Sequence, residues 1–393
     1  MVEFKDKLAN FQLLLVFLIP ITPHIEIAES IQLDDIPVIL FFFLFLINIY
    51  NQKINKLFFK ETLPFIYFIS YITIQNFLIN GDLFFSDNIR YLFYLLIFVT
   101  ILNYNPRKLI NDLFLYLSVT LGIFSILFYT FELNLGTDSY NYWNIGFNQN
   151  EWNFTKGRMN GFQAGGPNAF GGLIASLTLV TSSRHQGLFQ YLLIAIGTLG
   201  CFFTYSRGAF IILIFFLILY LLLSSNYVSI GILTGVFLII FNFGLIERYT
   251  SDIENQGIED RVEWQQASVS SISNNSFTEN FFGYGHGNFG IVNDKVDNLT
   301  EFSDDVTPTG PHNSFLFIIL NYGFLGLLIF LNIFLRPFLI FLNDLKKNFQ
   351  EPHYLFLGSF VALSFTGDFI QNHSISVLFF LTFFTLITDI NHE

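Results

Sequence analysis

The sequence carries little charge and almost no cysteine. Only 12% of its 393 residues are Asp, Glu, Lys or Arg, against roughly 25% in soluble domains. The formal net charge is −12, which argues against nucleic acid as a partner, because that binding needs clustered Lys and Arg. Cys201 is the single cysteine, so an intrachain disulfide and a cysteine-based metal site are both excluded.

Long apolar runs fill the chain instead. Apolar residues make up 53% of it, Phe alone accounting for 54 positions. Since about 20 apolar residues span a bilayer, the sequence predicts an all-α polytopic membrane protein with about twelve transmembrane helices; eleven also fit. The predicted spans are 9–22, 36–51, 63–80, 88–104, 109–131, 166–183, 187–204, 208–223, 227–246, 314–335, 354–371 and 373–390. In the tenth, a short surface helix ending near Gly323 before the true span is an alternative.

The positions of Lys and Arg orient the chain. With the N-terminus inside, eleven of the eighteen basic residues fall on the inner side, Arg107 and Arg184 among them, as expected for cytoplasmic loops. The N-terminal run lacks a small-residue cleavage site and is interpreted as the first helix. Two sizeable loops, 132–165 and 247–311, then lie on the outer side, the larger between the ninth and tenth spans. No repeat or linker divides residues 1–393, which we interpret as a single membrane domain.

Two outer motifs contain an arginine near a helix end. Arg158 precedes Gly166, Pro167 and Asn168. Pro167 suits a first helical turn, where its missing N–H is not needed, and the exposed amide donors of such a helix end can bind an anion. The alternative is that the glycines and Pro167 simply start a helix and have no binding role. Arg207 lies between two apolar runs in TYSRGAF. It needs an anionic partner, or it snorkels to the lipid headgroups.

The loop 247–311 holds two further motifs. Arg261 falls in a segment with helix-forming residues and acidic neighbours, so a solvated ion-pair face is the alternative to a binding role. The run GYGHGNFG, which includes Gly285 and His286, predicts a flexible backbone that approaches a ligand closely. It is not a nucleotide fingerprint, because no buried strand precedes it.

His312 and Asn313 directly precede the apolar run that starts at Ser314. Asn313 or Ser314 can cap a helix there. An imidazole at a water boundary can accept a proton from a hydroxyl near neutral pH. We rank His286 below His312 as a base, because its glycine neighbours suggest movement. Arg90 has a local partner in Asp87, one turn before it.

Taken together, these motifs resemble the O-antigen ligase and O-antigen polymerase superfamily of bacterial envelope enzymes. The resemblance rests on Arg158 ahead of the Gly-Pro-Asn helix start, the SRG run around Arg207, Arg261 upstream of the Gly285–Phe289 run, and the His312–Asn313 dipeptide before a glycine-containing helix. It implies a GT-C-like architecture in the bacterial inner membrane, with the active site facing the periplasm.

The resemblance also implies the chemistry. A glycan moves from an undecaprenyl diphosphate carrier to an acceptor hydroxyl, on a glycan or on lipid A-core, without a metal or nucleotide cofactor. His312 becomes the base, and Arg207 and Arg261 contact the diphosphate. Arg158, Asn168, Gly285 and Asn313 become substrate-binding residues. Two guanidiniums can neutralise the leaving diphosphate, and direct displacement would invert the anomeric carbon.

Three functions remain open at this point. A ligase and a repeat-unit polymerase of O-antigen, capsule or exopolysaccharide differ only in their acceptor, which the sequence does not identify. A flippase for polyprenyl-linked glycans belongs to a different class. Such transporters place charge along a central path and show related halves, and neither feature is visible here.

Overall fold

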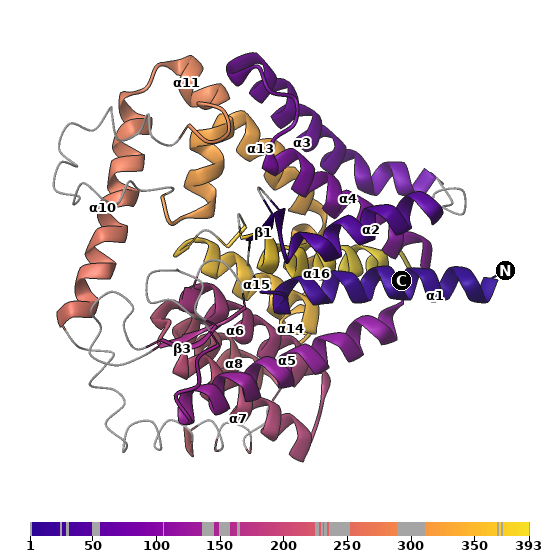
Figure 1. Cartoon of the computed structure of the whole chain (residues 1–393), viewed down its shortest axis with the longest axis vertical. Helices are drawn as coiled ribbons and strands as arrows, with labels where there is room; N and C mark the ends of the chain where they lie inside the picture. The colour runs from indigo at the N-terminus through magenta and orange to yellow at the C-terminus, as the bar shows by residue number, and fades with distance from the viewer. Residues whose placement is uncertain are drawn as a thin grey trace.

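The chain folds into a bundle of helices (Figure 1). The computed structural model describes all residues except 1, 24–25, 29–30, 49–55, 105, 136–144, 149–157, 163–165, 225–227, 229–230, 232–233, 236–251, 289–310, 368, 371 and 393. The helices are α1 (Val2–Leu18), η1 (Ile19–Ile21), α2 (Asp35–Asn48), α3 (Lys56–Asn80), α4 (Ser86–Tyr104), α5 (Arg107–Thr130), α6 (Gly166–Arg184), α7 (Leu188–Phe203), α8 (Arg207–Leu223), α10 (Asp252–Asn274), α11 (Phe277–Phe282), α13 (Ser314–Asn343), α14 (Leu345–Asn348), α15 (Pro352–Ser364) and α16 (His373–His392).

Eleven of the twelve predicted spans coincide with helices, so the described part of the chain is consistent with the predicted helical membrane architecture. A helix satisfies its own backbone polar groups, which lipid requires. Three helical stretches, Lys60–Asn80, Arg107–Thr130 and Ser314–Asn343, are long and apolar enough to cross a membrane, and four shorter helices are apolar. The predicted span 227–246 lies largely outside the described residues, and the count of twelve stays a prediction.

Two small hairpins add to the helices. β1 (Glu26–Ala28) pairs with β2 (Ile31–Gln32), and β3 (Gly146–Asn148) pairs with β4 (Arg158–Asn160), both antiparallel. The all-α prediction did not include them. The second hairpin belongs to the predicted outer loop 132–165, most of which lies outside the described residues.

Helix α6 forms the centre of the bundle. Every residue from Ala169 to Ser182 is buried, and α6 packs against α5, α7, α8 and α15. Small residues permit this close packing. A Cβ added to Gly197 of α7 would lie 2.0 Å from Thr178 Oγ1, and one added to Gly200 would lie 3.0 Å from the Cα of Gly122 in α5. The central helix is thus enclosed by its neighbours.

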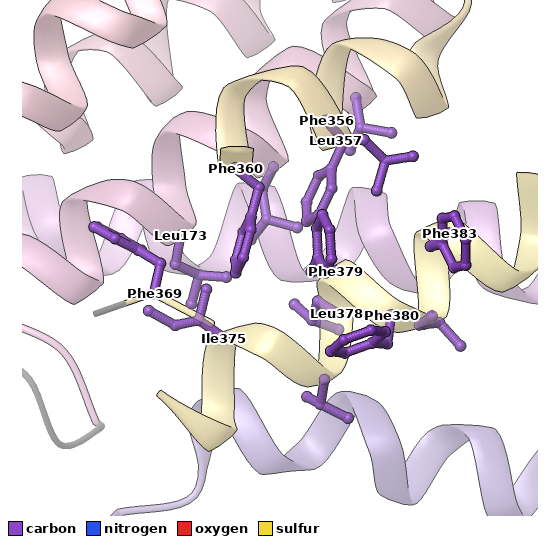
Figure 2. Close-up of a cluster of buried hydrophobic side chains, with 14 of the residues drawn as sticks. Leu173, Phe356, Leu357, Phe360, Phe369, Ile375, Leu378, Phe379, Phe380 and Phe383 are labelled. Carbon is purple, nitrogen blue, oxygen red and sulfur yellow. The ribbon is translucent and has the colours of Figure 1, made fainter. Parts of the chain in front are cut away.

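Phenylalanine rings fill the space between α6, α15 and α16 (Figure 2). Phe360 stacks on Phe379 with ring centroids 4.4 Å apart and meets the ring of Phe369 edge-on at 6.1 Å. Phe369 also lies against Gly172, whose added Cβ would come within 2.2 Å of that ring. Many of the phenylalanine side chains therefore build the core.

A charged network joins α5, α6, α15 and α16. Arg107 pairs with Asp389, and Asp389 also lies 4.0 Å from Nδ1 of His353. Arg184 Nη2 lies 2.8 Å from His353 Nε2, and the carboxylate of Glu351 is 3.2 Å from the other ring nitrogen. Both arginines belong to the set that the sequence predicts on the inner side.

Candidate functional site

Asn313 fixes the start of α13. Its side-chain oxygen accepts hydrogen bonds from the amides of Phe315 (3.0 Å) and Leu316 (3.1 Å), which confirms the predicted cap. His312 directly before it adopts a φ of 48°, a conformation that non-glycine residues seldom adopt. Its ring stacks on Trp264 of α10 with centroids 4.6 Å apart. The imidazole is therefore held at a helix start by a neighbouring aromatic ring.

Arg207 is the first residue of α8. The turn before it is tight, with Tyr205 at a φ of 52°, and it packs on Gly171 of α6, where an added Cβ would lie 2.5 Å from Thr204 Oγ1. On the other side of Arg207, Gly208 faces the loop after α15, and its added Cβ would lie 3.3 Å from Thr366 Oγ1. Glycine therefore lets this turn approach both neighbours.

The loop after α15 also receives the start of α13. The carbonyl of Phe365 accepts hydrogen bonds from Asn313 Nδ2 (3.3 Å) and from Gln265 Nε2 of α10 (3.4 Å). Ser314 Oγ donates to the carbonyl of Gly367 (3.1 Å) and accepts from the amide of Ile370 (3.1 Å). We call residues 365–370 the anchor loop. It brings together the His312–Asn313 dipeptide, the SRG turn of Arg207 and helix α10.

Arg261 lies on the same helix as the residues that contact the anchor loop. The predicted surface helix is confirmed as α10, and position 261 is four residues, about one turn, before Gln265. Gln265 Nε2 also donates to the carbonyl of His312 (3.3 Å). The side chain of Arg261 itself lies outside what the structure describes.

The remaining predicted positions near this site are Arg158 and Asn168. Arg158 is in β4, opposite Asn148, and its side chain is outside the described part. The next turn, at Gly161, packs on Phe170 of α6, where an added Cβ would lie 2.4 Å from the ring. Asn168 is in the first turn of α6, three residues before Gly171. Helix α6 thus packs on the Arg207 turn, and β4 packs on α6.

Helix α13 is broken at Gly323, as the alternative interpretation of its sequence proposed. Gly323 has φ 72° and ψ 178°, and its added Cβ would lie 2.2 Å from the carbonyl oxygen of Phe281. Gly283 on the crossing loop has a φ of 80°, and its added Cβ would lie 2.5 Å from the carbonyl oxygen of Asn321. Two glycines therefore let the backbone of the GYGHG loop cross α13 in direct contact.

The loop amides satisfy carbonyl groups that the break leaves free. The amide of Tyr284 donates to the carbonyl of Leu320 (2.8 Å), and that of Gly285 to the carbonyl of Asn321 (2.9 Å). The predicted substrate-binding position Gly285 thus makes a structural contact to α13. The prediction that this segment is flexible was wrong, because its backbone is hydrogen-bonded to a helix end.

Side chains of α3 complete this helix end. Gln75 Nε2 donates to the carbonyls of Phe282 and Asn321, both at 2.9 Å. Tyr71 donates its hydroxyl to the carbonyl of Tyr322 at 2.7 Å. The short helix from Ser314 to Tyr322 is therefore fastened at one end by the anchor loop and at the other by α3 and the GYGHG loop.

A second polar group, the Asp87 cluster, lies at this far end. It consists of Ser86, Asp87, Arg90, His286 and Tyr322. Asp87 is 2% exposed; its carboxylate pairs with Arg90 Nη1 at 3.1 Å, accepts from the Tyr322 hydroxyl at 2.5 Å and lies 3.3 Å from His286 Nδ1. His286 Nε2 lies 3.0 Å from Ser86 Oγ. The local Asp87–Arg90 pair was predicted; its partners, 200 residues further on, were not.

The His312–Asn313 dipeptide and the Asp87 cluster lie at opposite ends of the short helix from Ser314 to Tyr322. Seven residues separate Ser314 from Asn321, which corresponds to about 10 Å along a helix axis. In Figure 1, α10 stands beside this part of α13, and α11, which follows α10 in the chain, packs on α13. Among the described residues, no group of three or more His, Cys, Asp or Glu side chains is placed to hold a metal ion.

The comparison with protein families identifies the segment that carries most of these features. Residues 192–331 match a family model described as O-antigen ligase. The matched range contains Arg207, Arg261, Gly285, His312 and Asn313, and leaves out Arg158 and Asn168. No curated protein matches the chain. The match, with the apolar helices, supports a membrane enzyme of the O-antigen ligase or polymerase type. The resemblance of this chain to the O-antigen ligase-related superfamily is thereby confirmed, over residues 192–331.

Proposed function

We propose that this protein is a membrane glycosyltransferase that moves a glycan from an undecaprenyl diphosphate carrier to a sugar hydroxyl at the periplasmic face of the inner membrane. The observation that carries the proposal is the convergence of the Arg207 turn, the His312–Asn313 dipeptide and α10 on the anchor loop. A donor diphosphate and an acceptor hydroxyl must meet in one place, and these three elements supply a cation and a base there.

Arg207 is the proposed contact to the diphosphate. It begins α8, so the positive end of the helix dipole adds to its guanidinium. A guanidinium binds phosphate oxygens with two parallel hydrogen bonds. As the anomeric C–O bond breaks, negative charge grows on the departing diphosphate, and a fixed cation stabilises it. Arg261, on α10, is the second cation in this proposal.

His312 is the proposed base. Its ring takes the proton of the acceptor hydroxyl while the hydroxyl oxygen attacks the anomeric carbon. The stacked ring of Trp264 and the Gln265 bond to the His312 carbonyl hold the imidazole and its backbone in place. Preorganised geometry of this kind supports general-base catalysis. Attack opposite the leaving diphosphate inverts the anomeric configuration.

The test uses purified protein in liposomes with a lipid diphosphate-linked glycan and a candidate acceptor. Arg207→Lys keeps the charge and removes the two-pronged contact, and we expect turnover to fall on the order of 10²-fold. His312→Ala removes the base and should lower turnover by about 10²- to 10⁴-fold. Arg107→Lys and His185→Ala serve as matched controls, because Arg107 pairs with Asp389, and the ring of His185, directly after α6, bonds the carbonyl of Thr181.

The same assay decides between the remaining functions. Product on lipid A-core identifies a ligase, and product on a second lipid-linked repeat unit identifies a polymerase. Normal turnover of both site variants would refute the roles given to Arg207 and His312. Transbilayer movement of the lipid-linked glycan without any new glycosidic bond would instead favour the flippase.

A further inference from the structure

The Asp87 cluster contains a serine, a histidine and an aspartate in series. Ser86 Oγ lies 3.0 Å from His286 Nε2, and His286 Nδ1 lies 3.3 Å from Asp87 Oδ2. The two ring nitrogens are thus shared between a hydroxyl and a carboxylate. A nucleophile, a base and a group that orients the base have this arrangement in acyl-transfer enzymes on unrelated folds.

We infer that Ser86, His286 and Asp87 form a second catalytic site, in which Ser86 attacks a carboxylic ester. This site is independent of the proposed glycosyl transfer. It uses different residues, and Ser86 and Asp87 lie outside the range that matches the ligase family.

Ser86 is available for this role because it does not cap its helix. It is the first residue of α4, where a serine hydroxyl often bonds a backbone amide. No bond from a backbone amide to this hydroxyl is found in the described part of the chain; the Asn88 side chain accepts from the amide of Phe85, before the helix, at 3.1 Å. Among the described residues, the hydroxyl of Ser86 has His286 as its single hydrogen-bond partner. Ser86 is also exposed, so an ester can reach it.

His286 is held firmly enough to act as a base. Its amide donates to Asn76 Oδ1 (3.1 Å), and its carbonyl accepts from Asn80 Nδ2 (3.0 Å). The ring lies against Phe85, with centroids 4.9 Å apart. These contacts fix both the backbone and the ring plane, as a catalytic base requires.

Asp87 is held as a carboxylate that orients the ring. Arg90 pairs with one oxygen and the Tyr322 hydroxyl donates to the other, so a buried charge is neutralised and hydrogen-bonded. An ionised Asp87 favours the proton on His286 Nδ1, which leaves Nε2 free to accept the proton of Ser86.

The reaction follows from these positions. Ser86 Oγ forms a bond to the ester carbonyl carbon, and its proton moves to His286 Nε2. The amides of Asp87 and Asn88 belong to the first turn of α4, where backbone N–H groups lack intrahelical partners, and they are the donors assigned to the developing oxyanion in this proposal. The C–O bond to the alcohol then breaks, and the imidazole returns the proton to that alcohol. Water, activated by the same ring, releases the carboxylic acid from Ser86.

The residues beside Ser86 indicate the class of ester. Leu83 and Phe84 are 49% and 83% exposed, and they lie directly before the first turn of α4. Exposed apolar side chains at a membrane boundary suit an apolar acyl group. The expected substrate is therefore an ester of a fatty or short-chain carboxylic acid.

A fluorophosphonate probe tests the site, because it forms a stable bond with serines activated in this way. We expect mass spectrometry of the purified, labelled protein to find the adduct on Ser86, with labelling at least 10-fold slower in His286→Gln and absent from that position in Ser86→Ala. Ser273, exposed and bonded to a backbone carbonyl, is the internal control and should stay unmodified.

Two outcomes would overturn the inference. One is the absence of any Ser86 adduct in the wild-type protein. The other is equal labelling in wild type and His286→Gln. If His286→Gln fails to fold, His286→Asn replaces it, and labelling of Ser86 at the wild-type rate in that folded variant refutes the base. Hydrolysis of a p-nitrophenyl ester, lost in Ser86→Ala, completes the test.

Discussion

The hydroxyl of Tyr322 donates a 2.5 Å hydrogen bond to the carboxylate of Asp87, although 235 residues separate the two in the sequence. Tyr322 is the last residue before the break in α13, and Asp87 is in the first turn of α4. The contact therefore ties the broken helix, which carries His312 at its other end, to the N-terminal half of the bundle.

Removing this hydrogen bond should destabilise the protein more than removing a neutral one nearby. Tyr322→Phe leaves the buried Asp87 carboxylate short of a donor, and bonds to charged groups contribute about 1.5–3 kcal/mol. Tyr71→Phe removes a bond to a neutral carbonyl, which contributes about 0.5–1.5 kcal/mol. Unfolding of both variants in detergent measures the difference. Equal losses would contradict the charged character of the Asp87 contact.

The break in α13 should not tolerate a side chain. In Gly323→Ala the alanine would have to adopt a left-handed φ. Its Cβ would also lie 2.2 Å from the carbonyl oxygen of Phe281, which is a steric clash. Gly81 has a similar φ of 80° with nothing within 4 Å, so Gly81→Ala has only the backbone strain, about 1–2 kcal/mol. We expect Gly81→Ala to fold and Gly323→Ala to be recovered in far lower yield. Normal recovery of both proteins would mean that the loop and α13 can separate.

The ring of Trp264 should matter for the proposed transferase activity through His312. Aromatic stacking contributes about 0.5–1.5 kcal/mol, which corresponds to about a 2- to 13-fold change in rate if it acts in the transition state. We expect Trp264→Phe to retain most of the turnover and Trp264→Ala to lose about tenfold. Far-ultraviolet circular dichroism of both variants checks that α10 is intact. A Trp264→Ala protein with full turnover would show that the stacking does not position the base.

Stability should depend on pH through Glu351. The pKa of this carboxyl lies below its ordinary value of 4.5, mainly because of its hydrogen bond with His353. The positive charges of the nearby Arg184 and Arg107 lower the pKa further. A carboxyl with a lowered pKa contributes its full stabilisation to the folded state when the pH is above 4.5. That contribution is lost as the pH falls through the pKa of the carboxyl in the folded protein. Wild type should therefore exceed Glu351→Gln in melting temperature at pH 7, and the gap should close on acidification. A gap that stays the same size as the pH falls below 4.5 would contradict this assignment.

Local features of the fold were predictable from the sequence. Asn313 caps α13 because its side chain and the following apolar run are adjacent in the chain, and Arg261 lies on a helix because its neighbours favour one. The break at Gly323 was predicted as an alternative, since a glycine interrupts the apolar run there. The Asp87–Arg90 pair follows from helical spacing alone.

Features that depend on distant contacts were not predictable. Nothing in the order of residues reveals that Gly208 and Asn313 both contact the loop after α15. The GYGHG run was misread as flexible because glycine permits many conformations; here its positive φ angles let the loop lie directly on another backbone. His286 was ranked below His312 for the same reason, and its contacts with Ser86 and Asp87 span about 200 residues of the sequence.

The anchor loop sets a limit on how this protein can be divided. The family match ends at residue 331, yet the backbone groups that receive Asn313 and Ser314 come from Phe365, Gly367 and Ile370. A fragment that ends at residue 331 would keep the whole segment that matches the family model. It would lose the anchor loop, to which the start of α13 is hydrogen-bonded. Chimeras between relatives should therefore exchange the segment through α16 as one piece.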